Sequence, residues 1–242
     1  MNYKQFLLGL IIIVLTGCSG YTKKDGKVYL RSSNEARIGV RYLEVENADY
    51  SSFKVINQNT NLDLAKDKKH VFVGISILAD ADPSTFEQIK KYYWKDKSNV
   101  YLLQFGVNDS KIKQADVNTF EVIDKLWSKD KNHVYHKFEK LDGVAPNEFA
   151  VIDEDWGKDN SFFYWHELRI DSLDYTSAKI LSPYYIKDKD NVYYKNQLVE
   201  GANPSAFVPD GVGWFGHDDK NMYDREKNKG PITEQYRKTY LQ

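Results

Sequence analysis

The sequence predicts an all-β fold made of tandem β-hairpin repeats of about 30 residues, and three observations support this prediction. A polar phrase beginning Lys-Asp recurs, a second phrase containing Ala-Asp and Phe keeps the same interval, and the 242 residues include 18 Tyr, 12 Phe and 5 Trp. Aromatic residues suit pleated, half-buried surfaces. The leading aspartates of the first phrase are 29, 34, 29, 29 and 30 residues apart, at Asp67, Asp96, Asp130, Asp159, Asp188 and Asp218.

The first phrase has the composition of a β-hairpin around a tight turn. In the stretch from Tyr93 to Tyr101, aromatic and β-branched residues flank the polar group Asp96-Lys97-Ser98-Asn99. The Asp side chain can accept hydrogen bonds from the backbone that follows it, and Asn tolerates a positive φ. Full copies begin at Lys66, Lys95, Lys129 and Lys187, weaker copies at Lys158 and Asp218, and a shortened copy at Lys24.

The second phrase predicts a capped turn that delivers one aromatic side chain to the core. In Asp82-Pro83-Ser84-Thr85-Phe86, the Asp can cap a type I turn or a single helical turn whose next φ is preset by proline. Copies begin at Ala48, Ala115, Ala145 and Ala202, and a copy at Asp174 lacks the aromatic residue. We expect the recurring phenylalanines to be buried, namely Phe86, Phe120, Phe149 and Phe207.

One unit is therefore a hairpin plus a capped turn, and a lone hairpin is marginally stable in water. Neighbouring units must supply each other with a core, which predicts an open meander or solenoid-like array of stacked hairpins. The alternative is a small β-propeller, because roughly seven copies could close a ring.

Residues 1–17 have the pattern of a signal peptide, with Lys4 before an apolar run that is too short to span a bilayer. The run ends in Leu15-Thr16-Gly17-Cys18, which resembles the lipobox of bacterial lipoproteins and implies cleavage before Cys18 and lipid on its sulfur. Residues 18–24 would then be a short tether to the membrane. Ser19 favours the outer membrane of the cell envelope in a host with two membranes. The alternative is a plain signal peptide with a coincidental cysteine.

The repeated Asp-Lys-Asn/His-Val-Tyr phrase resembles the DKNYY family, which comprises bacterial repeat proteins often found as lipoproteins. The resemblance covers a repeat array at 63–226, preceded by a degenerate repeat at 25–62 and followed by a C-terminal cap or tail at 227–242. It implies no established activity, catalytic residue or cofactor. The copy at Lys158 departs from the pattern because it lacks the Val and the later Phe.

Charge and composition leave two classes of function. The 34 basic and 35 acidic residues are interleaved, which argues against nucleic-acid binding. The first class is a non-enzymatic envelope module that binds or scaffolds a protein or glycan partner, and the second is a carboxylate-dependent hydrolase acting on an envelope glycan. The remaining aromatics can pack in the core or line a binding surface: Tyr92, Tyr93, Trp94, Tyr184, Tyr185 and Trp214.

Two groups of residues are candidate metal ligands. Asp153, Asp155 and Asp159 alternate around Gly157 as oxygen ligands do in calcium loops, but the distal Glu of such loops is missing, so a solvated turn is the favoured interpretation. His133 and His136 would face opposite sides of a strand, which makes a poor metal pair.

Overall fold

The computed structural model describes residues 20–33, 40–56, 62–105, 110–210 and 213–240 of the chain. Strand makes up 40% of the chain and helix 4%, which confirms the all-β prediction. The described strands form seven small antiparallel sheets. They belong to two compact units, Met1–Ser84 and Thr85–Gln242.

The first unit contains two sheets whose strands follow one another in chain order. The three-stranded sheet consists of β1 (Tyr21–Lys24), β2 (Lys27–Ser33) and β3 (Val40–Glu44). The four-stranded sheet consists of β4 (Lys54–Val55), β5 (Leu64–Lys66), β6 (Val71–Val73) and β7 (Ser76–Ile77).

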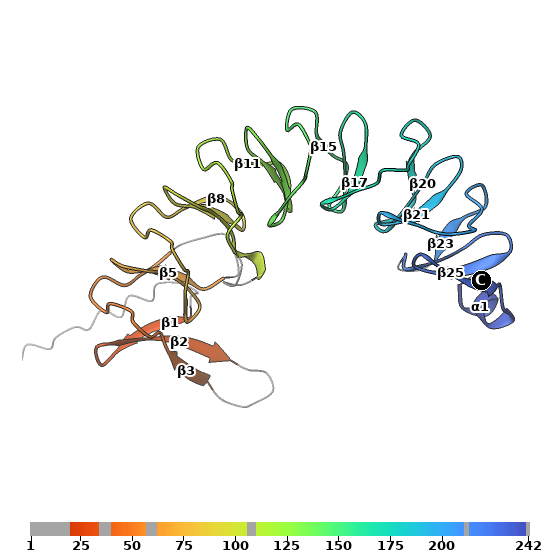
Figure 1. Ribbon diagram of the computed structural model, residues 1–242. Coiled ribbons are helices and arrows are strands. Elements are labelled where there is room, and N and C mark those ends of the chain that lie inside the picture. Colours follow the sequence, from red (N-terminus) through yellow and green to blue (C-terminus); the bar gives the residue numbers. More distant parts are fainter. Residues whose placement is uncertain (1–19, 34–39, 57–61, 106–109, 211–212, 241–242) are drawn as a thin grey trace, which may run out of the picture. The chain divides into compact units, whose positions relative to one another are not determined.

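The second unit contains five sheets that follow one another in sequence order (Figure 1). The first has three strands, β8 (Glu87–Lys90), β9 (Tyr93–Lys95) and β10 (Val100–Leu102), followed by the 3-10 helix Leu103–Phe105. This repeat is the one with the 34-residue interval. The next two sheets are β11 (Glu121–Val122), β12 (Trp127–Lys129), β13 (Val134–His136) and β14 (Glu139–Lys140), and then β15 (Ala150–Val151), β16 (Trp156–Lys158), β17 (Phe163–Trp165) and β18 (Leu168–Arg169).

Two further sheets complete this unit. They are β19 (Lys179–Ile180), β20 (Tyr185–Lys187), β21 (Val192–Tyr194) and β22 (Gln197–Leu198), and then β23 (Val208–Asp210), β24 (Phe215–His217), β25 (Asn221–Asp224) and β26 (Lys227–Pro231). Each predicted hairpin is a pair of neighbouring strands, central in the four-stranded sheets and at one side of the three-stranded sheets, and outer strands that the sequence did not predict extend it.

The leading aspartate of the first phrase closes the central hairpin, as predicted. Asp130 Oδ1 accepts the backbone N–H groups of Asn132 at 2.7 Å and His133 at 2.8 Å, and the N–H of Asp130 donates to the His133 carbonyl at 2.9 Å. The Tyr135 hydroxyl donates to Asp130 Oδ2 at 2.9 Å. Equivalent backbone bonds to the aspartate side chain recur at Asp67, Asp96, Asp159, Asp188 and Asp218.

The second phrase is bonded directly to the first, which explains their fixed spacing. The N–H of Asp116 donates to Asp130 Oδ2 at 2.9 Å, and the Asp116 carboxylate forms an ion pair with Lys131 Nζ at 2.8 Å. The N–H of Lys131 donates to Thr119 Oγ1 at 3.2 Å. The same three contacts hold Asp49 and Ser52 to the Asp67 turn, and Asp174 and Ser177 to the Asp188 turn.

The core lies between consecutive sheets, as the marginal stability of a lone hairpin predicts. Each buried cluster draws residues from two neighbouring sheets; Trp127 and Val134, for example, pack with Tyr164 of the following sheet. The Trp127 indole N–H also reaches the Asp153 carbonyl at 3.0 Å, and the Trp156 indole N–H reaches the Ser182 carbonyl at 3.1 Å. These bonds give a buried polar group a partner in the next repeat.

The prediction that the recurring phenylalanines are all buried was only partly right. Phe86 and Phe207 are buried, but Phe120 and Phe149 are half-buried. The Phe120 ring still lies between Tyr93 of the preceding sheet and Tyr135 of its own, at centroid distances of 5.9 and 6.2 Å. Phenylalanine at this position therefore contacts neighbouring rings even where one edge of it stays in water.

The phenylalanine of the second phrase packs against the residue two positions before the hairpin aspartate, and in three repeats the sizes of the two residues are complementary. A Cβ added to Gly157 would lie 2.3 Å from Phe149 Cζ, and one added to Gly216 would lie 2.4 Å from Phe207 Cζ. Where the phenylalanine is replaced by Ala178, the partner is the larger Ile186. In these three repeats one of the two residues is larger than the other, whereas Phe86 and Trp94 are both large and stack at a centroid distance of 5.0 Å.

The copy at Lys158 forms a complete four-stranded sheet despite its unusual residues. Phe163 occupies the position of the missing Val, and its ring packs against Tyr175 at a centroid distance of 5.2 Å. The Tyr175 hydroxyl donates to the Asp159 carbonyl at 2.8 Å. An aromatic residue next to Asp174 therefore replaces the one missing at Ala178.

Residues 227–240 cover the last sheet. β26 is its fourth strand, and the helix α1 (Glu234–Tyr240) buries Tyr236, whose hydroxyl donates to the Asp210 carboxylate and to the Gly216 carbonyl. Among the described residues, no helix combines the length and apolar character needed to cross a bilayer. The signal peptide at 1–17 and Cys18 lie outside the described residues.

Candidate functional site

The candidate site lies in the second unit, where the third strand of each repeat ends. β13, β17 and β21 end in His136, Trp165 and Tyr194. The following residue has a positive φ in each case: 55° at Lys137, 54° at His166 and 58° at Lys195. A bulky side chain is rare in that backbone region. The backbone N–H of this residue donates to the carbonyl of the residue just before the second strand of its sheet, as His166 does to Asp155 at 2.9 Å.

A side chain after the strand of one repeat covers the last strand residue of the preceding repeat. The His166 ring stacks on His136 at a centroid distance of 4.1 Å, and Lys195 Nζ lies 4.2 Å from the centre of the Trp165 ring. His166 and Trp165 also stack, with centroids 3.8 Å apart. The result is a continuous row of flat and cationic side chains along one edge of consecutive sheets.

A groove of about 620 Å³ lies beside this row, and all its lining residues belong to the second unit. Its apolar lining consists of Leu168 and four aromatic residues, of which Trp165 and Tyr194 are largely buried and Tyr184 and Trp214 are more exposed. Trp214 is 46% exposed. The Tyr184 ring stacks on Tyr194 at 5.9 Å and lies 6.5 Å from Trp165. The polar lining residues are Lys195, Asn196, Gln197, Arg225 and Glu226.

The aromatic residues that the sequence offered for either the core or a surface fall into both groups in the structure. Tyr184 and Trp214 line the groove, whereas Tyr93, Trp94 and Tyr185 are buried in the core. The Tyr185 hydroxyl donates to the Trp214 carbonyl at 3.0 Å, so a core residue fixes the backbone that carries the exposed Trp214.

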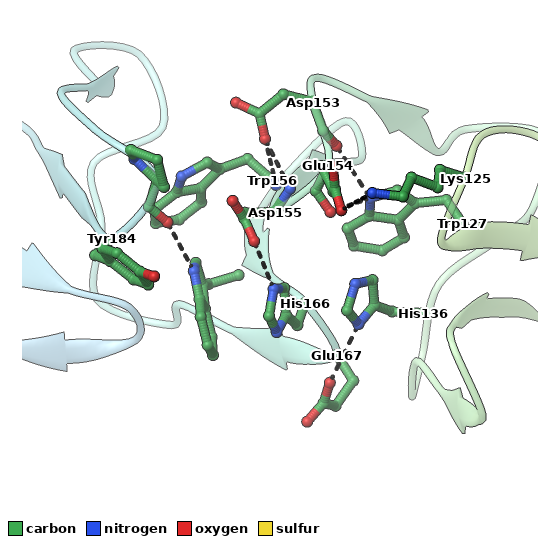
Figure 2. Close-up of polar contacts among 12 residues, drawn as sticks. Lys125, Trp127, His136, Asp153, Glu154, Asp155, Trp156, His166, Glu167 and Tyr184 are labelled. Carbon is green, nitrogen blue, oxygen red and sulfur yellow. Dashed lines mark hydrogen bonds and ion pairs between the residues drawn. The ribbon is translucent and has the colours of Figure 1, made fainter. Parts of the chain in front are cut away.

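A second cluster lies at the other end of the row. Figure 2 shows the imidazole rings of His136 and His166 next to each other, with Asp155 bonded to His166 and Glu167 facing His136. His166 Nε2 is 2.8 Å from Asp155 Oδ1, and His136 Nδ1 is 3.7 Å from Glu167 Oε2. His136 is 1% exposed.

Burial sets the protonation of both imidazoles. It lowers the pKa of His136 to about 3, helped by the charges of His166 and Lys137. It also lowers the pKa of His166, outweighing the hydrogen bond to Asp155, which raises it. Both rings are therefore neutral near pH 7, the state in which imidazole binds metal ions.

The three aspartates weighed as calcium ligands each have hydrogen-bond partners of their own. Asp153 Oδ1 accepts the N–H groups of Asp155 and Trp156 at 2.9 and 2.8 Å, Asp155 bonds His166, and Asp159 Oδ2 accepts the Tyr164 hydroxyl at 2.6 Å. Among the described residues, the His, Cys, Asp and Glu side chains whose ligand atoms lie within 4.8 Å of one another are instead His136, His166 and Glu167.

The other repeated carboxylates serve the turns. Burial alone would raise the pKa values of Asp67, Asp130 and Asp218, but the N–H groups that they accept outweigh burial and lower these pKa values. An ionised carboxylate that accepts several backbone bonds is a structural acceptor.

Sequence reasoning missed the pairing of His136 with His166 because it compared histidines only within one strand. The signal lay in the repeat register. His136 is six residues after its hairpin aspartate and His166 is seven after the next one, as are Trp165 and Lys195 in the following pair. Stacked repeats bring these two positions together.

Comparison with known proteins gave one match. A family model described as the DKNYY family matches residues 21–167 and 156–239. No curated protein and no solved structure matches the chain.

Proposed function

The chain belongs to the DKNYY family, and from this premise we propose that it is a membrane-anchored envelope lipoprotein whose repeats bind a glycan without catalysing a reaction. The observation that carries the proposal is the groove lined by Trp165, Tyr184, Tyr194 and Trp214. The family match supports a repeat module, and the groove gives that module a place to bind.

The lining of the groove suits a sugar better than a purely apolar ligand. A sugar ring has a flat C–H face and a rim of hydroxyl groups. The faces of Trp214 and Tyr184 match the first, because aromatic rings offer a large and rigid apolar surface. The amides of Asn196 and Gln197 and the charges of Arg225 and Glu226 match the second, because they can donate or accept hydrogen bonds at the ring edge.

A glycan hydrolase is the second candidate. Glycosidases typically place two carboxyl groups about 5 to 10 Å apart on either side of the scissile bond. Among the described residues that line the groove, Glu226 supplies the carboxylate, and the turn aspartates are held by backbone N–H groups. The lack of a second groove carboxylate among the described lining residues favours binding over hydrolysis. Release of reducing ends from a bound glycan, with loss of release in Glu226→Gln, would favour the hydrolase.

Binding can be tested with soluble oligosaccharides of three classes: neutral glucose oligomers, N-acetylated amino-sugar oligomers and uronic-acid oligomers. We expect one class to bind with a Kd of about 1 mM or tighter, and to change tryptophan fluorescence. Trp214→Ala should weaken binding by at least about tenfold, because exposed aromatic anchors carry much of the affinity of such sites. Tyr42→Ala is a matched control, since Tyr42 is 58% exposed and lies in the first unit.

Three results would count against a glycan site: no class binds at concentrations of about 10 mM, well above the Kd expected here; Trp214→Ala binds normally; or Tyr42→Ala weakens binding equally. Urea unfolding of both variants shows whether a loss of binding reflects a loss of fold. Trp214 lies on the surface, so we expect its replacement to change stability by less than about 1 kcal/mol.

The anchor is tested separately. Cys18 follows an apolar run and a lipobox-like sequence, so it should carry the lipid. In cells supplied with a clickable palmitate analogue, the chain should be labelled and sediment with membranes, and Cys18→Ser should abolish both. Unlabelled protein in the membrane fraction would indicate a different mode of attachment.

A further inference from the structure

We propose that His136, His166 and Glu167 form a binding site for a divalent transition-metal ion of the zinc class, which joins two consecutive repeats. His136 ends β13, whereas His166 and Glu167 form the turn between β17 and β18 in the next sheet. This site is separate from the aromatic groove, and the glycan proposal does not depend on it.

The spacing of the three side chains fits coordination better than hydrogen bonding. Their ligand atoms all lie within 4.8 Å of one another, and His136 Nδ1 is 3.7 Å from Glu167 Oε2. That distance is too long for a hydrogen bond. Two ligands of a tetrahedral zinc ion, each bound at about 2.0 to 2.2 Å, lie roughly 3.3 to 3.6 Å apart. A small rotation of the half-exposed Glu167 side chain is sufficient to reach that spacing.

His136 is also a buried imidazole in need of a partner. Its Nδ1 atom lies 3.7 Å from Glu167 Oε2, which is beyond hydrogen-bond distance, and its ring also interacts with the Glu154 backbone. A buried polar group without a partner is destabilising. A metal ion at Nδ1 would give this nitrogen the strong interaction that the long contact with Glu167 does not supply.

His166 already has the support that a metal-binding histidine requires. Its Nε2 atom is 2.8 Å from Asp155 Oδ1, so this nitrogen carries the proton and Nδ1 keeps a free lone pair. A carboxylate that holds the far side of the ring is the usual outer partner of a zinc-binding histidine. Asp155, a weak calcium-ligand candidate from the sequence, lies behind a histidine in the structure.

The local charges permit a cation. Lys137 is a positive charge that acts on both rings, and at His166 the carboxylates of Asp155 and Glu167 oppose it. Two imidazoles and one carboxylate select zinc, copper or nickel over calcium or magnesium.

A neutral stacked pair without metal is the alternative that an experiment must separate from this proposal. The rings of His136 and His166 are nearly parallel, at 17°, and lie between Trp127 and Trp165, with centroid distances of 4.6 Å from Trp127 to His136 and 3.8 Å from Trp165 to His166. Coordination requires the two rings to tilt so that their lone pairs converge. This movement is a rotation about the terminal side-chain torsion, which has broad minima.

The test uses the full chain, freed of metal with a chelator and titrated with zinc chloride by calorimetry and with cobalt chloride by visible absorption. We expect one equivalent of zinc to bind and cobalt to give the intense visible bands of a four-coordinate site. Glu167→Gln and His166→Asn should each weaken zinc binding by at least about tenfold, and Asp155→Asn by about 10- to 100-fold.

His133→Asn is the matched control, because His133 lies in the same repeat but outside the cluster, and other copies have Asn at this position, as at Asn99 and Asn191. It should bind zinc like the unchanged chain. Glu167 is half-exposed, so Glu167→Gln should fold normally even if changes at the buried His136 do not. No saturable binding, or equal binding by Glu167→Gln, His166→Asn and His133→Asn, would overturn the proposal.

Discussion

Because the sizes of Phe149 and Gly157 are complementary, we predict that the two residues can be replaced together by the pair of residues found one repeat later. There, Ala178 stands in the phenylalanine position and Ile186 in the glycine position. Phe149→Ala alone should destabilise the chain by about 2 kcal/mol, roughly half the loss for a fully buried Phe, because Phe149 is half-buried. Gly157→Ile alone should cost about 1 to 3 kcal/mol, because its side chain would occupy the space of the Phe149 ring.

The double variant restores the packing of Ala178 and Ile186, so its loss should be about 1 kcal/mol or less. This corresponds to a coupling free energy of about 2 kcal/mol or more. Urea unfolding followed by tryptophan fluorescence measures all four chains. Phe120→Ala combined with Gly157→Ile is the control, because Phe120 packs between Tyr93 and Tyr135 and should give no rescue. Additive losses in the Phe149→Ala, Gly157→Ile double variant would refute the reasoning.

Three further predictions concern the turn contacts. The N–H bonds to Asp67, Asp130 and Asp218 lower the pKa values of these carboxyl groups below 3.8. The stability that the three ionised carboxylates contribute should therefore be present above about pH 4 and be lost as the pH falls through their folded-state pKa values. Equal urea midpoints at pH 3 and pH 6 would contradict this prediction. Tyr135→Phe removes the hydroxyl bond to Asp130 and should destabilise the chain by about 1 to 2 kcal/mol in urea unfolding, although Phe72 occupies the same position naturally; an unchanged midpoint would show that the bond contributes nothing. Lys131→Ala breaks an exposed ion pair with Asp116 and should cost less than about 1 kcal/mol, with the difference disappearing in 1 M salt; a larger loss that persists in salt would show that Lys131 stabilises the turn by packing.

The local chemistry of each repeat could be predicted from the sequence because it depends on neighbouring residues. Asp130 closes its turn with N–H groups two and three residues later, and the side chain that does so is visible in the sequence. The complementary sizes of Phe149 and Gly157, and of Ala178 and Ile186, could not be predicted from either phrase alone. The two members of each pair belong to different phrases, and their contact is visible only in the structure.

The site was harder to predict because it depends on how one repeat sits on the next. From the sequence, Tyr184, Tyr185 and Trp214 are equal candidates for a surface, but Tyr185 is buried whereas Tyr184 and Trp214 line the groove. Alternation along a strand does not decide which side faces a neighbouring sheet when both faces are covered. The stacking of His166 on His136 follows from the offset between repeats, which the structure supplies.

The bonds that hold the two phrases together join residues close in the chain, for example Asp116 to Asp130 and Lys131 to Thr119, with separations of 14 and 12 residues. Contacts between residues so close in sequence form quickly, because closing a short loop has a small entropic cost. A polypeptide that emerges from a narrow channel one end first can therefore fold behind the opening repeat by repeat, without waiting for its last residues. Each folded repeat then presents a surface on which the next repeat packs, so the unfolded part of the chain needs no contacts with residues distant in sequence.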